Sequence, residues 1–116
     1  MITRQLAQTR PSGTSAESIF TSGGIQTHDR PYKLHSVIIC NVSGSTLNMS
    51  LFHDVDGSTY DESTALFFEY PMTAGQTLIM SEPLTDYQIA GNLGGQSSVA
   101  NGITFTVYGE IQGEQL

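Results

Sequence analysis

The chain has 116 residues, of which 38% are hydrophobic and 13% are charged, so it can build one hydrophobic core with about half the usual charge of a soluble domain. Its net charge is −7, and residues 41–116 contain acidic residues but no Lys or Arg. A negative body of this kind excludes nucleic acid and anionic membranes as partners.

The single cysteine, Cys40, lies in the apolar run 37–40. This position predicts a buried small hydrophobe and argues against a disulfide partner or a catalytic thiol. No apolar stretch has the length of a signal peptide or of a membrane span. We therefore expect one domain over residues 1–116, synthesised in a cytoplasm.

The first thirty residues are rich in Ser, Thr, Gly and Gln, with chain breakers at 11–13 and 22–24. Extended pieces are predicted between these breaks, at residues 4–8 and 16–20. Residues 1–13 are predicted to form either an N-terminal arm that lies on a neighbour or an edge strand.

From residue 32 onward, alternating apolar residues predict a series of short strands. Residues 34–42 have apolar side chains on both faces, with Leu34 grouped on the face of Ile38, which indicates a central strand. Residues 47–51 alternate simply, and the turn at 43–45 predicts that these two strands form a hairpin. Further strands are predicted at residues 65–70, 76–81, 86–90, 97–100 and 103–108.

Turn residues separate these strands about every ten positions, as in sandwiches and barrels. The glycine-rich stretch 91–95 is predicted to break the chain, and Asn101-Gly102 is predicted to be a hairpin turn. The weak helical candidate, residues 61–68, has Thr and Phe where helices favour Ala and Leu. The predicted fold is therefore all-β: an antiparallel β-sandwich or jelly-roll of about eight short strands with an extended N-terminal arm.

The acidic loop Asp54–Glu62 contains several possible oxygen ligands close together, as a calcium-binding loop does. An EF-hand loop has Gly at its sixth position and Glu at its twelfth, whereas this loop has Gly57 at the fourth and Ala65 at the twelfth. A hairpin turn at Asp56-Gly57 explains the same residues. We predict no metal and no cofactor.

The three histidines, His28, His35 and His53, are the candidate bases. His28 and His53 each precede an aspartate, but neighbouring side chains on a strand point to opposite faces, so neither pair forms a ready-made dyad. The sequence predicts surface or interface histidines, no catalytic residue and no enzyme.

Two stretches carry a resemblance to a known group of proteins. Residues 36–44, continuing through 51–61, resemble small structural proteins of tailed bacteriophage virions, and residues 4–11 and 103–109 fit the same pattern. Proteins of this kind are β-sandwich or jelly-roll modules that act as decoration or cement subunits on capsid exteriors, with related modules at necks and tails. The resemblance implies a virion component and supplies no catalytic residue.

We therefore expect a capsid decoration subunit located in the virion, with a homotrimer as the expected state and the major capsid protein or other virion proteins as partners. The predicted inter-subunit contact residues are the four basic residues Arg4, Arg10, Arg30 and Lys33. One alternative is a neck or tail adaptor, or a fibre-associated module. Another is a carbohydrate-binding or adhesion module that uses loop tyrosines such as Tyr60.

Overall fold

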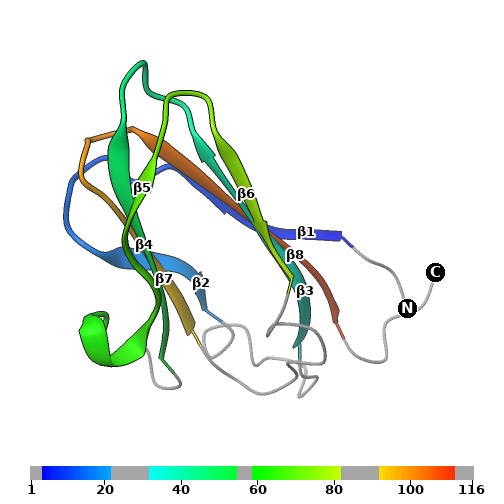
Figure 1. Cartoon of the computed structure of the whole chain (residues 1–116). Helices are drawn as coiled ribbons and strands as arrows, with labels where there is room; N and C mark the ends of the chain where they lie inside the picture. The colour runs from blue at the N-terminus through cyan, green and yellow to red at the C-terminus, as the bar shows by residue number, and fades with distance from the viewer. Residues whose placement is uncertain (1–3, 22–31, 55–58, 82–91, 112–116) are drawn as a thin grey trace.

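The computed structural model describes residues 4–21, 32–54, 59–81 and 92–111. These residues form eight strands and one short 3-10 helix (Figure 1). The elements are β1 (Arg4–Thr9), β2 (Glu17–Thr21), β3 (Tyr32–Asn41), β4 (Leu47–Asp54), η2 (Glu62–Thr64), β5 (Ala65–Met72), β6 (Thr77–Met80), β7 (Asn92–Ser97) and β8 (Ile103–Ile111).

The strands pair into two antiparallel four-stranded sheets. Sheet A has the order β1-β8-β3-β6, and sheet B has the order β2-β7-β4-β5. From β1 to β7, each described strand except β4 is followed along the chain by a strand of the opposite sheet, which is the interleaved connectivity of a jelly roll. The predicted all-β, antiparallel sandwich or jelly-roll fold is confirmed.

The N-terminal segment is an edge strand in its described part. β1 pairs with β8 from Arg4 to Thr9, and Leu6 and Ala7 pack against the core. Of the two alternatives for residues 1–13, the structure therefore has the edge strand at residues 4–9. Deletion of residues 1–13 would therefore remove β1 from sheet A.

The core lies between the two sheets. Alternate residues of each strand point inward, because successive side chains of a strand face opposite sides. Three central strands supply most of the fully covered side chains: Leu34, Val37 and Ile39 from β3, Leu47, Met49 and Leu51 from β4, and Ile103, Phe105 and Val107 from β8. Each such side chain contributes about 1.5–3 kcal/mol on burial.

A β-bulge in β3 changes which residues face the core. The register with β8 shifts between Leu34 and Ser36, so one extra residue, His35, is accommodated on β3. Leu34 therefore points inward with Val37, whereas Ile38 points outward. The predicted grouping of Leu34 with Ile38 is wrong for this reason, but β3 is a central strand, as predicted.

The predicted hairpin of residues 34–42 with 47–51 is wrong, because β3 belongs to sheet A and β4 to sheet B. The buried amide of Asn41 fixes this crossover. Its Nδ2 donates to the carbonyl oxygens of Ser45, Met72 and Thr73, and its Oδ1 accepts from the backbone N–H of Ser43. The turn after Asn41 therefore links sheet A to sheet B, although its residue types are equally compatible with a hairpin between paired strands.

The stretch Asn92–Ser97 is the central strand β7, so the predicted chain break at 91–95 is wrong for its described residues. A Cβ on Gly94 would lie 2.6 Å from the ring of Tyr60, and one on Gly95 would lie 2.7 Å from the ring of Phe105. Aromatic rings thus occupy the space beside both glycines. The predicted strand at 86–90 lies outside the described residues.

Residues 98–102 form a turn, so the predicted strand at 97–100 is wrong beyond Ser97. Asn101 adopts a left-handed conformation with φ of 58°, as the Asn-Gly signal indicates. The turn is not the predicted hairpin, however, because it links β7 of sheet B to β8 of sheet A.

The 3-10 helix η2 is a single turn that is capped by Asp61. The Asp61 carboxylate accepts from the hydroxyl and the backbone N–H of Ser63, and these hydrogen bonds lower the pKa of Asp61. Residues 65–72 then continue as a strand, in agreement with the prediction. Within the described ranges, no helix is long and apolar enough to cross a membrane.

Candidate functional site

Uncharged side chains form two rows on the outer face of sheet A. Ile38 pairs with both Ile79 and Thr106, and Cys40 pairs with both Thr77 and Thr104, so these two rows point away from the core. Gln8 extends the first row, and its amide donates to the hydroxyl of Thr106 at 3.1 Å. We call this set the sheet A face: Gln8, Ile38, Cys40, Thr77, Ile79, Thr104 and Thr106.

Ile79 is the most exposed large hydrophobic residue of this face, with 69% of its surface accessible. It lies on β6, which has a strand neighbour on one side only among the described residues. Edge strands of soluble proteins commonly carry charges or proline that prevent pairing with another chain, but β6 reads Thr-Leu-Ile-Met. The sheet A face therefore combines an exposed apolar side chain with a strand edge that no described strand pairs with.

Sheet B also exposes apolar side chains at its outer edge. Phe68 and Tyr70 of β5 are 48% and 39% exposed, and β5 is the last strand of sheet B. The ring of Tyr70 contacts the ring of Phe67 edge-on, with centroids 5.5 Å apart. Phe68 and Tyr70 on β5 and Ile79 on β6 are thus exposed on two consecutive strands, which residues 73–76 connect.

The predicted contact residues are spread over the molecule. Arg4 begins β1, whereas Arg10 follows its other end and donates from Nε to the carbonyl oxygen of Asn101 at 2.8 Å. Lys33 lies on β3 in register with Glu110 of β8, and Arg30 lies outside the described residues. The structure does not bring Arg4 and Arg10 together, and their role in contacts stays a prediction.

A pair that the sequence analysis missed joins His35 to Glu110. Nε2 of His35 lies 2.9 Å from Oε2 of Glu110, and the Glu110 residue is only 6% exposed. The two residues are 75 positions apart and meet because β3 pairs with β8. No local sequence motif predicts a pair of residues so far apart in the chain. The contact gives the buried carboxyl group of Glu110 a hydrogen-bonding partner.

The neighbouring residues His53 and Asp54 were also candidate chemical groups in the sequence, and both lie at the end of β4. Burial lowers the pKa of His53, although the charge of Asp54 acts in the opposite direction. Asp54 accepts from the backbone N–H of Thr59 at 2.8 Å. Residues 55–58 and His28 lie outside the described ranges, and the described residues contain no group of three or more potential metal ligands.

Cys40 differs from its predicted environment. It is partly exposed on the sheet A face instead of buried, and its sulfur accepts from the hydroxyl of Thr77 at 3.5 Å. The inward positions beside it belong to Ile39 and Asn41, which are both fully buried. The apolar run around Cys40 therefore has one face in the core and one face on the sheet A surface.

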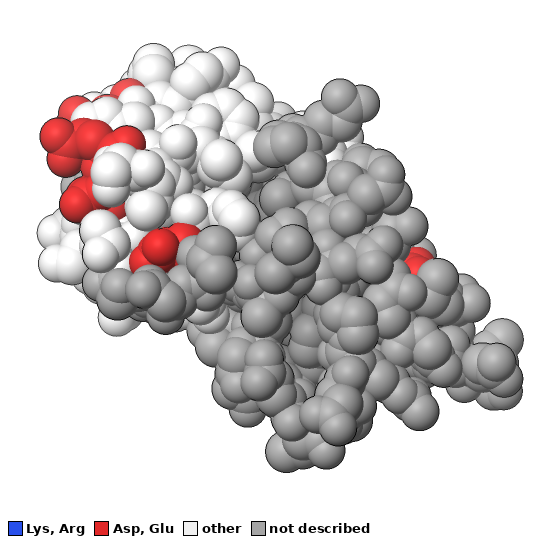
Figure 2. Space-filling model, turned by 90° about the horizontal axis from the view of Figure 1, so that it is seen from below, with Lys and Arg blue, Asp and Glu red and all other residues white. Residues whose placement is uncertain are grey.

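Acidic groups occupy the end of the sandwich that carries η2. Figure 2 shows acidic side chains, and no Lys or Arg, among the described residues visible from below. Asp61 and Glu62 are exposed in the segment at this end. This surface is unsuited to a polyanion.

Comparison of the chain with protein-family models, with curated proteins and with solved structures finds no match. The resemblance to bacteriophage structural proteins therefore stays a prediction, and the function has to be argued from the fold and its surfaces.

Proposed function

We propose that the protein is a non-enzymatic structural component of a bacteriophage virion, namely a capsid decoration or cement subunit that stabilises the shell through protein–protein contacts. The jelly-roll connectivity supports this proposal, because jelly rolls are a recurrent architecture of viral capsid proteins. The resemblance of residues 36–61 to small virion proteins points in the same direction.

The observation that carries the proposal is the sheet A face. Its side chains are apolar or neutral, and Ile79 is 69% exposed on β6, which has a strand neighbour on one side only among the described residues. Burial of apolar surface against another subunit contributes about 25 cal/mol per Å². Addition of a strand to β6 would supply main-chain hydrogen bonds as well. Covering this surface with another protein is therefore energetically favourable.

The proposed partners are other copies of this chain and the shell protein beneath them. Closed symmetric assemblies are the usual form of homo-oligomers, and we propose a trimer. Exposed ion pairs contribute about 0–1 kcal/mol each, so Arg4 and Arg10 would steer the contact more than they would stabilise it. The affinity would come from the area buried at the sheet A face.

The test replaces Ile79 with lysine. The variant should fold, because the side chain lies outside the core, and it should lose both self-association and binding to purified shells that lack this protein. Sedimentation velocity measures the first property, and co-sedimentation with the shells measures the second. Ser12→Lys is the matched control, since it adds the same charge at an exposed turn residue.

The control variant should behave as the wild type in both assays. If Ile79→Lys assembles and binds shells as well as the wild type does, the sheet A face is not the contact surface. If the wild-type protein binds no shell or tail component at all, the proposed function is wrong.

A further inference from the structure

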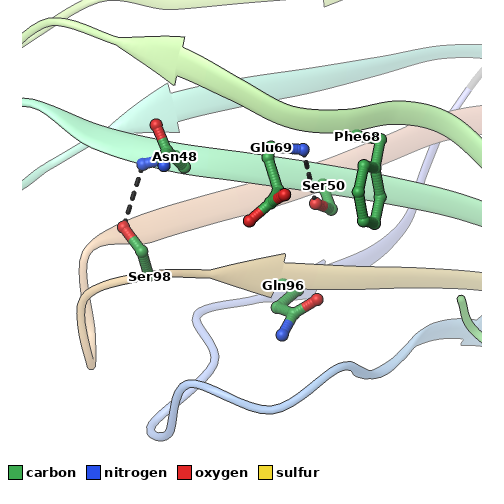
Figure 3. Close-up of a pocket in the computed structure, with 6 residues that line it drawn as sticks. All are labelled: Asn48, Ser50, Phe68, Glu69, Gln96 and Ser98. Carbon is green, nitrogen blue, oxygen red and sulfur yellow. Dashed lines mark hydrogen bonds between the residues drawn. The ribbon is translucent and has the colours of Figure 1, made fainter. Parts of the chain in front are cut away.

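The outer face of sheet B contains a hollow of about 180 Å³. Its lining comes from three neighbouring strands and the first residue after β7 (Figure 3). The lining residues are Asn48, Ser50, Phe68, Glu69, Gln96 and Ser98. This hollow belongs to the opposite sheet from the sheet A face, so the proposed assembly surface makes no use of it.

A β-bulge in β5 shapes the hollow. Ser50 of β4 stands opposite two residues, Phe68 and Glu69, because the register shifts between Met49 and Leu51. Glu69 adopts a left-handed φ of 50°, and its backbone N–H donates to the hydroxyl of Ser50 at 2.9 Å. Bulges re-aim side chains, and backbone strain in non-glycine residues is concentrated at functional sites. Here the bulge holds an aromatic ring and a carboxylate at one hollow.

Hydrogen bonds also hold the other walls of the hollow in place. The backbone N–H of Asn48 donates to the hydroxyl of Ser98 at 2.9 Å, which ties β4 to the end of β7. The side-chain nitrogen of Gln96 donates to the carbonyl oxygen of Thr14 at 3.0 Å, which leaves its amide oxygen as an acceptor. The lining thus presents amide, hydroxyl and carboxylate groups from fixed positions.

We propose that this hollow binds one neutral sugar ring, such as the terminal hexose of a glycan. The half-exposed ring of Phe68 offers an apolar surface to the C–H face of a sugar, and the surrounding polar groups suit ring hydroxyls that both donate and accept. Glu69 alone is charged among the described lining residues, so an anionic ligand is disfavoured. The volume lies below the roughly 300–1,000 Å³ of sites for drug-sized ligands, so it fits a single ring.

Tyr60, the tyrosine predicted to contact a sugar, does not line this hollow. Its ring packs over Gly94 and lies 6.0 Å from the ring of Phe52, and its hydroxyl donates to Ser18. The structure therefore moves the sugar-binding hypothesis from the loop tyrosine to Phe68 on β5. The inference does not rest on the proposed virion function.

The experiment is an NMR titration of the full-length, ¹⁵N-labelled protein with methyl glycosides of glucose, galactose, mannose and N-acetylglucosamine. At least one glycoside should cause saturable shifts of the backbone amides of Asn48, Gln96 and Ser98, while Ile79 is unaffected. Phe68→Ala should weaken this binding by about fivefold to tenfold, the effect of one lost ring contact.

Two further variants separate the alternatives. Asn48→Ala should weaken binding without unfolding the protein, because this side chain is exposed, whereas Tyr60→Phe should bind as the wild type does. Glu69→Gln should retain sugar binding, because an amide still accepts hydrogen bonds. Saturable shifts with none of the glycosides would overturn the proposal. Shifts at the hollow that appear only with lysine amide and vanish in Glu69→Gln would also overturn it, in favour of a protein side chain as the occupant.

Discussion

Replacing Gly95 with alanine would insert a methyl group between the central strand β7 and the core. The added Cβ would lie 2.7 Å from two ring atoms of Phe105 and 3.1 Å from a third. Phe105 is fully buried, so its ring has no solvent-filled space into which it could move. The substitution therefore overpacks the core.

The expected cost can be worked out from two opposing effects. Overpacking of a close-packed core costs about 1–3 kcal/mol. Alanine also restricts the unfolded chain more than glycine does, which returns about 0.4–1 kcal/mol. The net loss in the free energy of unfolding should be about 1–2 kcal/mol, which corresponds to a decrease in Tm of about 4–8 °C for a domain of this size.

Urea denaturation followed by circular dichroism measures this loss, and Gly13→Ala is the matched control. A Cβ at Gly13 would meet no heavy atom within 4 Å, so this variant should be as stable as the wild type or slightly more stable. Replacing Phe105 with leucine in the Gly95→Ala background should cost less than the sum of the two single changes, because the smaller side chain relieves the clash. A Gly95→Ala variant as stable as the wild type would refute the packing of β7 against Phe105.

Three other changes test particular contacts. Burial lowers the pKa of His53 below its ordinary 6.5, so the unfolded chain takes up a proton more readily and stability should fall as pH drops below 6.5. His53→Asn should show less of this decline in urea denaturation between pH 7.5 and 5, and an unchanged decline would contradict the assignment. Asn41→Ala removes the amide shared by three backbone carbonyls and should lower the free energy of unfolding by about 1–3 kcal/mol, whereas thermal unfolding at the wild-type Tm would argue against this role. His35→Ala removes the side chain that lies 2.9 Å from the buried carboxyl of Glu110 and should lower the free energy of unfolding by about 1–3 kcal/mol. Adding Glu110→Gln to this variant should restore part of the loss. Equal stability of the wild type, the single variant and the double variant would show that the two residues are not coupled.

Much of the strand content could be predicted from the sequence, because alternation of side chains is a local signal. Residues 47–51 alternate plainly, and they lie within β4. The pairing of strands is not local, however. The turn after Asn41 uses the same residue types for a crossover as for a hairpin, so the sequence did not reveal that β3 and β4 lie in different sheets.

Glycine accounts for the wrong assignment of residues 91–95. The composition of residues 91–95 is typical of a loop, but Gly94 and Gly95 are required in a strand because aromatic rings from distant segments lie against them. Only the folded structure shows that Tyr60 and Phe105 occupy this space. A glycine-rich stretch can therefore be a central strand when aromatic rings from distant parts of the chain pack directly against its backbone.

The surfaces were predicted less well than the strands. The alternation in residues 76–81 places Ile79 opposite Leu78 and Met80, as the structure confirms. The sequence does not show which of the two faces is covered, since both are apolar. The charges of Arg4 and Arg10 are evident in the sequence, whereas the exposure of Ile79 depends on the position of β6 as the last described strand of sheet A.

We propose that this jelly roll covers a viral shell through its sheet A face. A density map of the phage particle that carries the protein tests the claim most directly. We predict many copies of the eight-stranded fold on the capsid exterior, with β6 and Ile79 against a neighbouring subunit. A single ring of copies at the neck or tail, or a sheet A face open to solvent in every copy, would contradict the account.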